Sequence, residues 1–205
     1  MTGGVGCGKS EVLAYLENAY GAVILRTDDL AKELMMPGEV CYQDVLALFG
    51  PDVLQEDGML DRVKMAEKVF ADEDLLQKLN AVTHPAVLKR TEEIIRGAEE
   101  KGAVLICLES ALFLDSQGNR IGNEIYRELW YVYADEAARR ERLKASRSYS
   151  DEKISSIMAN QVPESMLRRS CDCVIDNSGD FAETRKQIDV LLKDMPKSGR
   201  QPEEP

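Results

Sequence analysis

The stretch GGVGCGKSE, residues 3–11, decides the fold because it joins a glycine-rich loop to the start of a helix. Gly3, Gly8, Lys9 and Ser10 fit the pattern G-x-x-x-x-G-K-[ST]. In that pattern the glycines let the backbone curl until successive N–H groups point inward, and the following helix adds the positive end of its dipole. The stretch therefore predicts a nucleotide phosphate site rather than an ordinary glycine-rich turn.

Each fixed position of this loop has a chemical role. The lysine side chain reaches the β and γ phosphates of a bound nucleotide, and the serine hydroxyl is suited to Mg²⁺. The expected phosphate-binding residues are Gly4, Gly6, Cys7, Gly8, Lys9, Ser10 and Glu11. A nucleotide and Mg²⁺ bound through Ser10 are thus what the stretch predicts.

Short apolar stretches alternate with helical patterns along the rest of the chain. The predicted strands lack strict polar alternation, as in a parallel sheet covered on both faces, and are 21–25, 103–109, 129–135 and 173–176. The helical patterns are 10–20, with Val12, Leu13, Leu16 and Tyr20 on one stripe, 61–100 and 136–170. This order predicts an α/β fold of the P-loop NTPase type, with the two long helical regions added to the core as lobes.

Little chain precedes the loop. A P-loop is normally the turn between a central strand of the sheet and a helix, but only Met1 and Thr2 stand before Gly3. Two residues are too few for a strand. We therefore expect the first strand to be missing and the sheet to have a gap beside 21–25 or 103–109.

Composition limits the classes of function. The 205 residues are 44% hydrophobic, which suits one domain with a sizeable core. The 37 acidic residues exceed the 26 basic ones, and the net charge of −11 argues against general binding to nucleic acid or a membrane surface. No membrane-span or signal pattern is present, so we expect a cytoplasmic protein. Five cysteines without a C-x-x-C pair and one histidine argue for reduced thiols and against a zinc site.

Acidic residues follow two predicted strands. Asp28 and Asp29 come after 21–25, and Glu109 ends 103–109. Ligands of open α/β sheets bind at the carboxyl ends of strands, so these side chains are candidates to face the γ-phosphate or to hold a magnesium-bound water. Either aspartate would also serve as a helix N-cap, and Glu109 would also suit a loop edge. Position alone leaves these alternatives open.

Several stretches in a fixed order resemble the dephospho-CoA kinase family, whose members phosphorylate the ribose 3′-hydroxyl of dephospho-CoA with ATP. The stretches are TGGVGCGKS (2–10), TDDLAKEL (27–34), FGPDVLQEDGMLDRVKMAEKVFAD (49–72), LNAVTHPAV (79–87), LESALFLD (108–115), RRERL (139–143) and VIDNSG (174–179). The resemblance implies a P-loop core, a helical lobe that meets the CoA portion and a mobile lid.

The resemblance also implies residue roles on the substrate side. Asp28 matches the family's candidate general base for the ribose hydroxyl, whereas Arg26 stands where the family has another acid. His84 before Pro85 matches a family pair, although a plain turn remains the alternative. The expected substrate contacts are Asp28, Asp61, Arg62, His84 and Glu109.

On the nucleotide side, Asn177 and Gly179 match the loop near adenine, where an ordinary N-S-G turn is the alternative. Arg142 matches a lid arginine, but Ser146 stands where many members have a second one, and Arg147 follows it. A helix would turn Arg147 by about 100° from that direction, so Arg147 serves only if the helix ends before it, as we expect. Lid arginines would neutralise the transferring phosphoryl group, and a solvated basic face is the alternative.

Together these expectations describe one kinase domain over 1–193. Its core comprises 1–57, 102–135 and 171–193, the CoA lobe about 58–101 and the lid about 136–170, with a disordered tail at 194–205. The expected catalytic residues are Lys9, Asp28, Arg142 and Arg147. We expect ATP and Mg²⁺, a small-molecule substrate, and a monomer or weak homo-oligomer without nucleic-acid or membrane partners. Another small-molecule or nucleotide kinase, or a nucleotide-binding protein that has lost catalysis, is the alternative.

Overall fold

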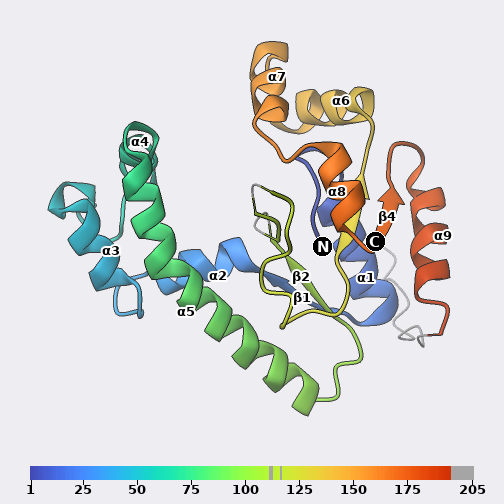
Figure 1. Ribbon diagram of the computed structural model, residues 1–205, viewed down its shortest axis with the longest axis horizontal. Helices are drawn as coiled ribbons and strands as arrows, with labels where there is room; N and C mark the ends of the chain where they lie inside the picture. Colours follow the sequence, from blue (N-terminus) through green and yellow to red (C-terminus); the bar gives the residue numbers. More distant parts are fainter. Residues whose placement is uncertain (111–112, 116, 195–205) are drawn as a thin grey trace. The chain divides into compact units, whose positions relative to one another are not determined.

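The computed structural model describes residues 1–110, 113–115 and 117–194, and Figure 1 shows their helices and strands. In chain order the elements are α1 (Lys9–Tyr20), β1 (Val23–Arg26), α2 (Thr27–Leu34), α3 (Tyr42–Phe49), η1 (Pro51–Val53), α4 (Arg62–Ala71), α5 (Glu73–Glu100), β2 (Ile106–Glu109), β3 (Trp130–Tyr133), α6 (Glu136–Arg147), α7 (Asp151–Ala159), α8 (Glu164–Ser170), β4 (Cys173–Asp176) and α9 (Phe181–Leu191). Strands alternate with helices, as predicted. None of the described helices combines the length and apolar character that a membrane crossing demands.

The described chain divides into two compact units. Unit 1 comprises Met1–Leu25 and the described residues from Lys101 on, and unit 2 comprises Arg26–Glu100. Unit 2 therefore begins at Arg26 and not at residue 58, because α2 and α3 both pack against α5. Of the expected tail, residues 195–205 lie outside the described part of the chain.

Unit 1 contains two pairs of short strands. β1 is hydrogen-bonded to β2, and β3 pairs with β4 in parallel. The pairing of β3 and β4 runs from Trp130 opposite Cys173 to Tyr133 opposite Asp176. The carboxyl ends of β3 and β4 therefore lie together, which brings the residues after β4 close to those after β3.

Met1 and Thr2 lie beside both strand pairs. The Thr2 N–H donates to the Trp130 carbonyl at 2.8 Å, and the Thr2 carbonyl accepts from the Val132 N–H at 2.9 Å. The Met1 amino group donates to the Leu108 carbonyl of β2 at 2.6 Å. Met1 and Thr2 thus connect β2 with β3 through backbone hydrogen bonds.

The core of unit 1 fixes α1 against the strands. The predicted inward stripe of α1 is buried, and its members are Val12, Leu13, Leu16 and Tyr20. They share one apolar cluster with Val132 of β3, Ile175 of β4 and Ile188 of α9. Each buried side chain of this size contributes about 1.5–3 kcal/mol. This packing holds α1 in place, and with it the loop that precedes α1.

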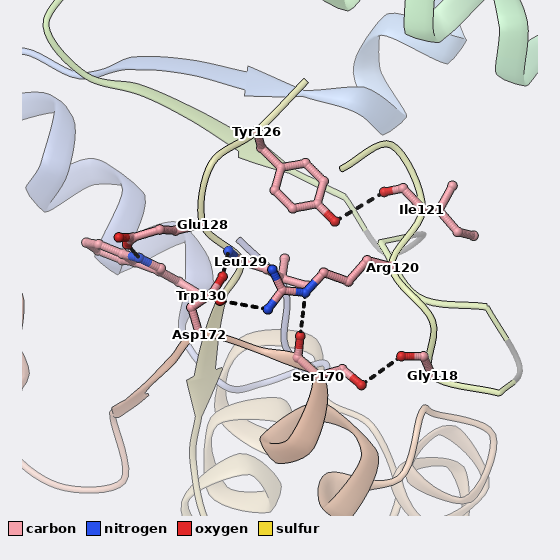
Figure 2. A network of polar contacts seen from close by, with 9 residues as sticks. All are labelled: Gly118, Arg120, Ile121, Tyr126, Glu128, Leu129, Trp130, Ser170 and Asp172. Atoms are coloured by element: carbon pink, nitrogen blue, oxygen red, sulfur yellow. Dashed lines mark hydrogen bonds and ion pairs between the residues drawn. The ribbon is translucent and has the colours of Figure 1, made fainter. Parts of the chain in front are cut away.

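A polar network ties the segment between β2 and β3 to the start of β4. Figure 2 shows the Arg120 guanidinium between two acceptors, the Ser170 carbonyl and the Asp172 carboxylate, each at 2.8 Å. The other carboxylate oxygen of Asp172 accepts from the Leu129 N–H at 2.7 Å, and the Ser170 hydroxyl donates to the Gly118 carbonyl at 2.7 Å. The Arg120 bond also holds the pKa of Asp172 below its usual range. These contacts set where β4 begins.

Unit 2 is helical. Its longest helix, α5, contacts α2, α3 and α4, and is drawn in green in Figure 1. Met65 of α4 belongs to the apolar cluster of this unit, and Val69, Leu75, Leu79 and Val87 pack against it. Pro85 lies inside α5, so His84 and Pro85 do not form the turn that was the alternative for them.

Candidate active site

The loop of residues 3–8 leads into α1 as the pattern predicts. Gly8 is the N-cap of α1 with φ of 85°. Among the described residues no protein acceptor is assigned to the N–H groups of Gly8 and Ser10, as at a helix N-terminus that is open to an anion, whereas the Lys9 N–H interacts with the Cys7 thiol. Glu11 differs, because its N–H already donates to the Gly8 carbonyl at 3.1 Å and its side chain is exposed. The amides that are open to an anion therefore lie before Glu11.

Lys9 folds back over the loop. Its Nζ donates to the Gly3 carbonyl at 2.8 Å and to the Gly4 carbonyl at 3.4 Å. The ammonium group therefore lies on the same loop as the open N–H groups of the helix start. A phosphate bound there meets both the amides and the charge.

Cys7 contributes only backbone to the loop. Its side chain is 1% exposed and belongs to the core cluster of unit 1. Burial raises the pKa of the Cys7 thiol above its usual value. The thiol is therefore protonated and directed into the core, and a nucleotide contact at Cys7 comes from the peptide group.

Asn177 supports the loop from the core side. Its side chain is fully buried; Nδ2 donates to the Cys7 carbonyl at 2.9 Å, and Oδ1 accepts from the Thr184 hydroxyl at 2.8 Å. A Cβ at Gly8 would lie 2.2 Å from Nδ2, so only glycine fits there. The Asn177 side chain is therefore occupied in holding the loop, whereas Gly179 is exposed and has open space where a side chain would be.

Replacing Asn177 by aspartate is expected to weaken ATP binding by about tenfold, because the donor to the Cys7 carbonyl becomes an oxygen and the loop loses a buried bond. Calorimetric titration with ATP measures the change. The matched control is Asn123→Asp, at an exposed position outside the site. Equal ATP affinity in the two variants would show that Asn177 does not order the loop.

Two lid residues outside the predicted set also contact the loop. Arg139 of α6 donates through Nε to the Val5 carbonyl at 2.9 Å and through Nη2 to the side-chain oxygen of Gln161. A Cβ at Gly4 would lie 2.6 Å from Arg139 Nη2 and 2.7 Å from the Gln161 oxygen. A sequence signal for Arg139 existed, because it precedes Arg142 by three residues and shares its helix face.

Arg142 of α6 also lies near the loop, beside Gly8. Its Nη1 atom is buried and has no hydrogen-bond partner among the described residues. A Cβ at Gly8 would lie 3.5 Å from this atom. A buried guanidinium nitrogen without an acceptor is costly unless an anion binds it. The atom therefore indicates an anion site beside the loop.

Arg147 points in another direction. The expectation that the helix ends before Arg147 is wrong, because α6 includes it and is closed by Ser148 at φ of 52°. Five residues of helix turn Arg147 by about 140° from Arg142. Its exposed guanidinium lies 5.9 Å from the centre of the Tyr149 ring. The structure does not bring the two arginines to one side of the lid.

Glu109 stands at the end of β2. The residue before it, Leu108, accepts the hydrogen bond from the Met1 amino group. Glu109 is partly buried. Its position at a strand end, beside the chain that enters the phosphate loop, is the one that the sequence predicts for an acidic residue near bound phosphate.

In unit 2 the predicted acidic pair lies in the first turn of α2. The N-cap of α2 is Arg26, so the N-cap alternative for either aspartate is wrong. Asp29 pairs with Lys32 at 2.5 Å, and this bond lowers the pKa of Asp29. Asp28 is exposed, and no hydrogen bond or ion pair holds its carboxylate within the described residues. Of the two aspartates, Asp28 is therefore the one whose carboxylate has no partner within the described chain.

The other predicted substrate residues of unit 2 differ in their hydrogen bonds and exposure. Asp61 caps α4 by accepting from the N–H groups of Val63 at 3.0 Å and Lys64 at 3.2 Å. Its carboxylate therefore already stabilises the helix start. Arg62 and His84 are exposed on α4 and α5.

Known proteins resemble this chain along nearly its whole length. The dephospho-CoA kinase family profile matches residues 1–183. A dephospho-CoA kinase of Carboxydothermus hydrogenoformans is 36% identical over 194 residues, which cover 94% of this chain and 91% of that protein. The dephospho-CoA kinase of Shouchella clausii is 33% identical over 194 residues, which cover 94% and 96%.

Solved structures agree with these relatives. The crystal structure of TT1252 from Thermus thermophilus matches with a TM-score of 0.77 and 29% identity, covering 95% of each chain. Dephospho-CoA kinase from Campylobacter jejuni shares the fold, with a TM-score of 0.64 at 17% identity over 94% of this chain and 93% of that one. The profile match and the sequence relatives show that the chain belongs to the dephospho-CoA kinase family.

Proposed function

We propose that this protein transfers the γ-phosphoryl group of ATP to the ribose 3′-hydroxyl of dephospho-CoA, giving coenzyme A and ADP. The observation that carries the proposal is the buried, unpartnered Nη1 of Arg142 beside Gly8, in a chain of the dephospho-CoA kinase family. Phosphoryl transfer depends mainly on positioning and on stabilising charge, and a cation held against a phosphate loop supplies both.

Asp28 acts at the acceptor hydroxyl. Its carboxylate takes the proton of the 3′-hydroxyl while the hydroxyl oxygen forms its bond to the γ-phosphorus. The bond from the γ-phosphorus to the β–γ bridging oxygen breaks, and that oxygen leaves with ADP. The open carboxylate of Asp28, without an ion pair in the described chain, suits this role.

Lys9 and Arg142 act on the phosphate side. The Lys9 ammonium already lies over the loop carbonyls, and Arg142 approaches the loop from the lid. Both stabilise negative charge on the transferring group, the first from the loop and the second from α6. Arg139 connects α6 to the loop through its hydrogen bond to the Val5 carbonyl.

The residues present fit a Mg²⁺ ion that binds with the nucleotide. Ser10 is exposed in the first turn of α1, and within the described chain its hydroxyl has no partner. No three His, Cys, Asp or Glu side chains among the described residues converge on one metal position. Mg²⁺ usually takes one or two protein ligands and completes its shell with phosphate and water. When bound, it neutralises charge on the β and γ phosphates.

A coupled assay for ADP release tests the proposal. With ATP and Mg²⁺ present, ADP release is expected to depend on added dephospho-CoA and to saturate with it. Adenosine and shikimate serve as unrelated acceptor alcohols. An ADP release rate that does not change when dephospho-CoA is added would contradict the proposed function.

Arg142→Ala is expected to lower kcat by about 10²-fold, because a donor aimed at developing charge is removed from a water-poor site. Arg147→Ala is expected to cost at least about tenfold less, because Arg147 lies on another side of α6. Steady-state kinetics of both variants with ATP and dephospho-CoA make the comparison. An equal or larger loss of kcat in Arg147→Ala would show that the charge-stabilising role does not belong to Arg142.

A further inference from the structure

Helix α8 leads the chain back to the strands of unit 1, and a side chain from a distant segment holds its last residue. Arg120 donates through Nε to the Ser170 carbonyl at 2.8 Å and through Nη2 to the Asp172 carboxylate at 2.8 Å (Figure 2). The last carbonyls of a helix lack partners within the helix, and a cation there also complements the helix dipole. Arg120, Ser170 and Asp172 thus form an anchor, the α8 anchor, at the carboxyl end of α8.

The α8 anchor is itself held firmly. The Asp172 N–H donates to the Leu129 carbonyl at 2.8 Å, and the Asp172 carboxylate accepts from the Leu129 N–H at 2.7 Å. The Ser170 hydroxyl donates to the Gly118 carbonyl at 2.7 Å. A Cβ at Gly118 would lie 2.7 Å from Met166 Cγ, so the backbone at Gly118 lies directly against α8. The anchor therefore joins α8 both to the start of β3 and to the segment that carries Arg120.

The other end of α8 leads to the phosphate loop. The N-cap of α8 is Pro163, and Gln161 stands two residues before it. The side-chain oxygen of Gln161 accepts a hydrogen bond from Arg139, which also donates to the Val5 carbonyl at 2.9 Å. Helix α8 has seven residues and is therefore about 10 Å long. One short helix thus separates the α8 anchor from the contacts over the loop.

Side chains in the middle of α8 also pack against unit 1. Leu167 is 6% exposed, and the Arg168 guanidinium lies 4.5 Å from the centre of the Tyr133 ring. A rigid helix that is held in its middle and at its carboxyl end has a fixed direction. When its carboxyl end is released, the helix turns about the buried Leu167, and Gln161 moves with the other end.

The position of Gln161 matters because the contacts at the loop are close. A Cβ at Gly4 would lie 2.6 Å from Arg139 Nη2 and 2.7 Å from the Gln161 oxygen. Gln161 gives Arg139 an acceptor on the side away from the Val5 carbonyl and so fixes the direction of its guanidinium. A loop that is ordered before ATP arrives loses less conformational freedom on binding, and its affinity is higher.

We propose that Arg120 and Asp172 are positioning residues for ATP binding, because they fix α8 so that Gln161 and Arg139 stay against the phosphate loop. Neither residue is among those that the sequence predicts for the site, and both act through α8 rather than by contact with the nucleotide. The inference rests on the proposed function only in taking ATP as the ligand of the loop.

Arg120→Gln is expected to raise the Kd for ATP, measured by calorimetry with Mg²⁺ present, by about tenfold. The binding stoichiometry is expected to stay the same. A merely structural role would lower the stoichiometry through unfolded molecules and leave the Kd of the folded ones unchanged. Arg127→Gln is the control, because Arg127 is an exposed arginine of the same segment. Equal Kd values in the two variants would overturn the proposal.

Asp172→Asn is a second variant that keeps the shape of the side chain. The amide oxygen still accepts from the Leu129 N–H, but the ion pair with Arg120 is lost. The Kd for ATP is expected to rise by about fivefold. Glu124→Gln, at an exposed position of unit 1, is the control with the same charge change. A Kd equal to that of Glu124→Gln would remove Asp172 from the positioning role.

A double-mutant cycle tests the route through α8. If Arg120 acts through Gln161, the double variant Arg120→Gln, Gln161→Ala weakens ATP binding no more than Gln161→Ala alone. Additive effects on the Kd would overturn the route.

An ADP release assay on the unmodified chain separates this inference from the proposed function. If dephospho-CoA is turned over but the Kd for ATP does not respond to Arg120→Gln, the inference is wrong and the function stands. If the Kd responds as expected but dephospho-CoA is not turned over, the inference stands and the function is wrong.

Discussion

Lys9→Ala is expected to lower kcat/KM for ATP by about 10³-fold or more while the protein stays folded. The Lys9 ammonium lies on the phosphate loop, where its present partners are the Gly3 and Gly4 carbonyls. Removing it takes away the loop's own positive side chain but no part of the core. The kinetics of ADP release measure the loss of kcat/KM, and a thermal melt checks that the protein stays folded.

Lys101→Ala is the control for Lys9→Ala, because Lys101 is an exposed lysine of unit 1 away from the loop. The melting temperature of Lys9→Ala is expected to fall by only a few degrees, since few partly exposed hydrogen bonds are lost. Turnover close to that of Lys101→Ala would contradict the assignment of the loop as the phosphate site.

Asp28→Asn is expected to lower kcat by about 10²- to 10⁴-fold, which is the usual contribution of a general base. The affinity for ATP is expected to remain, because Asp28 acts on the acceptor. The amide has the same shape as the carboxylate, so the first turn of α2 stays intact. Stopped assays with saturating ATP and dephospho-CoA measure kcat, and calorimetry measures ATP binding.

Asp44→Asn is the matched control for Asp28→Asn, because Asp44 is also an exposed first-turn acid of a unit 2 helix. Asp29→Asn gives a second comparison, since Asp29 is held by Lys32 and is expected to cost less in kcat. A larger kcat loss in Asp29→Asn than in Asp28→Asn would move the base to the neighbouring carboxylate. A sharp fall in melting temperature without loss of kcat per folded molecule would give Asp28 a structural role instead.

The parts of the fold that could be predicted from sequence are those with local causes. The stripe of Val12, Leu13, Leu16 and Tyr20 follows from the period of a helix, and all four are buried. The phosphate loop follows from glycine spacing and the helix start. Its open N–H groups and the overlying lysine result from a few adjacent residues, so no distant contact was needed to predict them.

The lid contacts could not be predicted in the same way. Arg139 reaches Val5 across 134 positions of sequence, and many basic residues in 136–170 compete for that place. Only packing decides which of them lies against the loop. The direction of Arg147 depended on whether α6 ended one residue earlier, and helix ends are the least predictable feature of a helix.

Asn177 shows a second limit of local patterns. An N-S-G sequence after a strand is typical of an ordinary turn with an exposed asparagine side chain. Its side chain is buried because Cys7, 170 positions away, and Thr184 of α9 converge on it. The N-cap alternative for Asp28 and Asp29 is wrong for a smaller reason. The helix α2 begins at Thr27 with Arg26 as its N-cap, so both aspartates lie inside it.

Transfer of label from γ-³²P-ATP to dephospho-CoA, in the presence of Mg²⁺, tests the central claim most directly. The account predicts one labelled coenzyme A for each ADP formed, with the label removed by a 3′-nucleotidase and none formed by Lys9→Ala above background. Label in inorganic phosphate alone, or label in the product at a position that the 3′-nucleotidase does not release, would contradict the account.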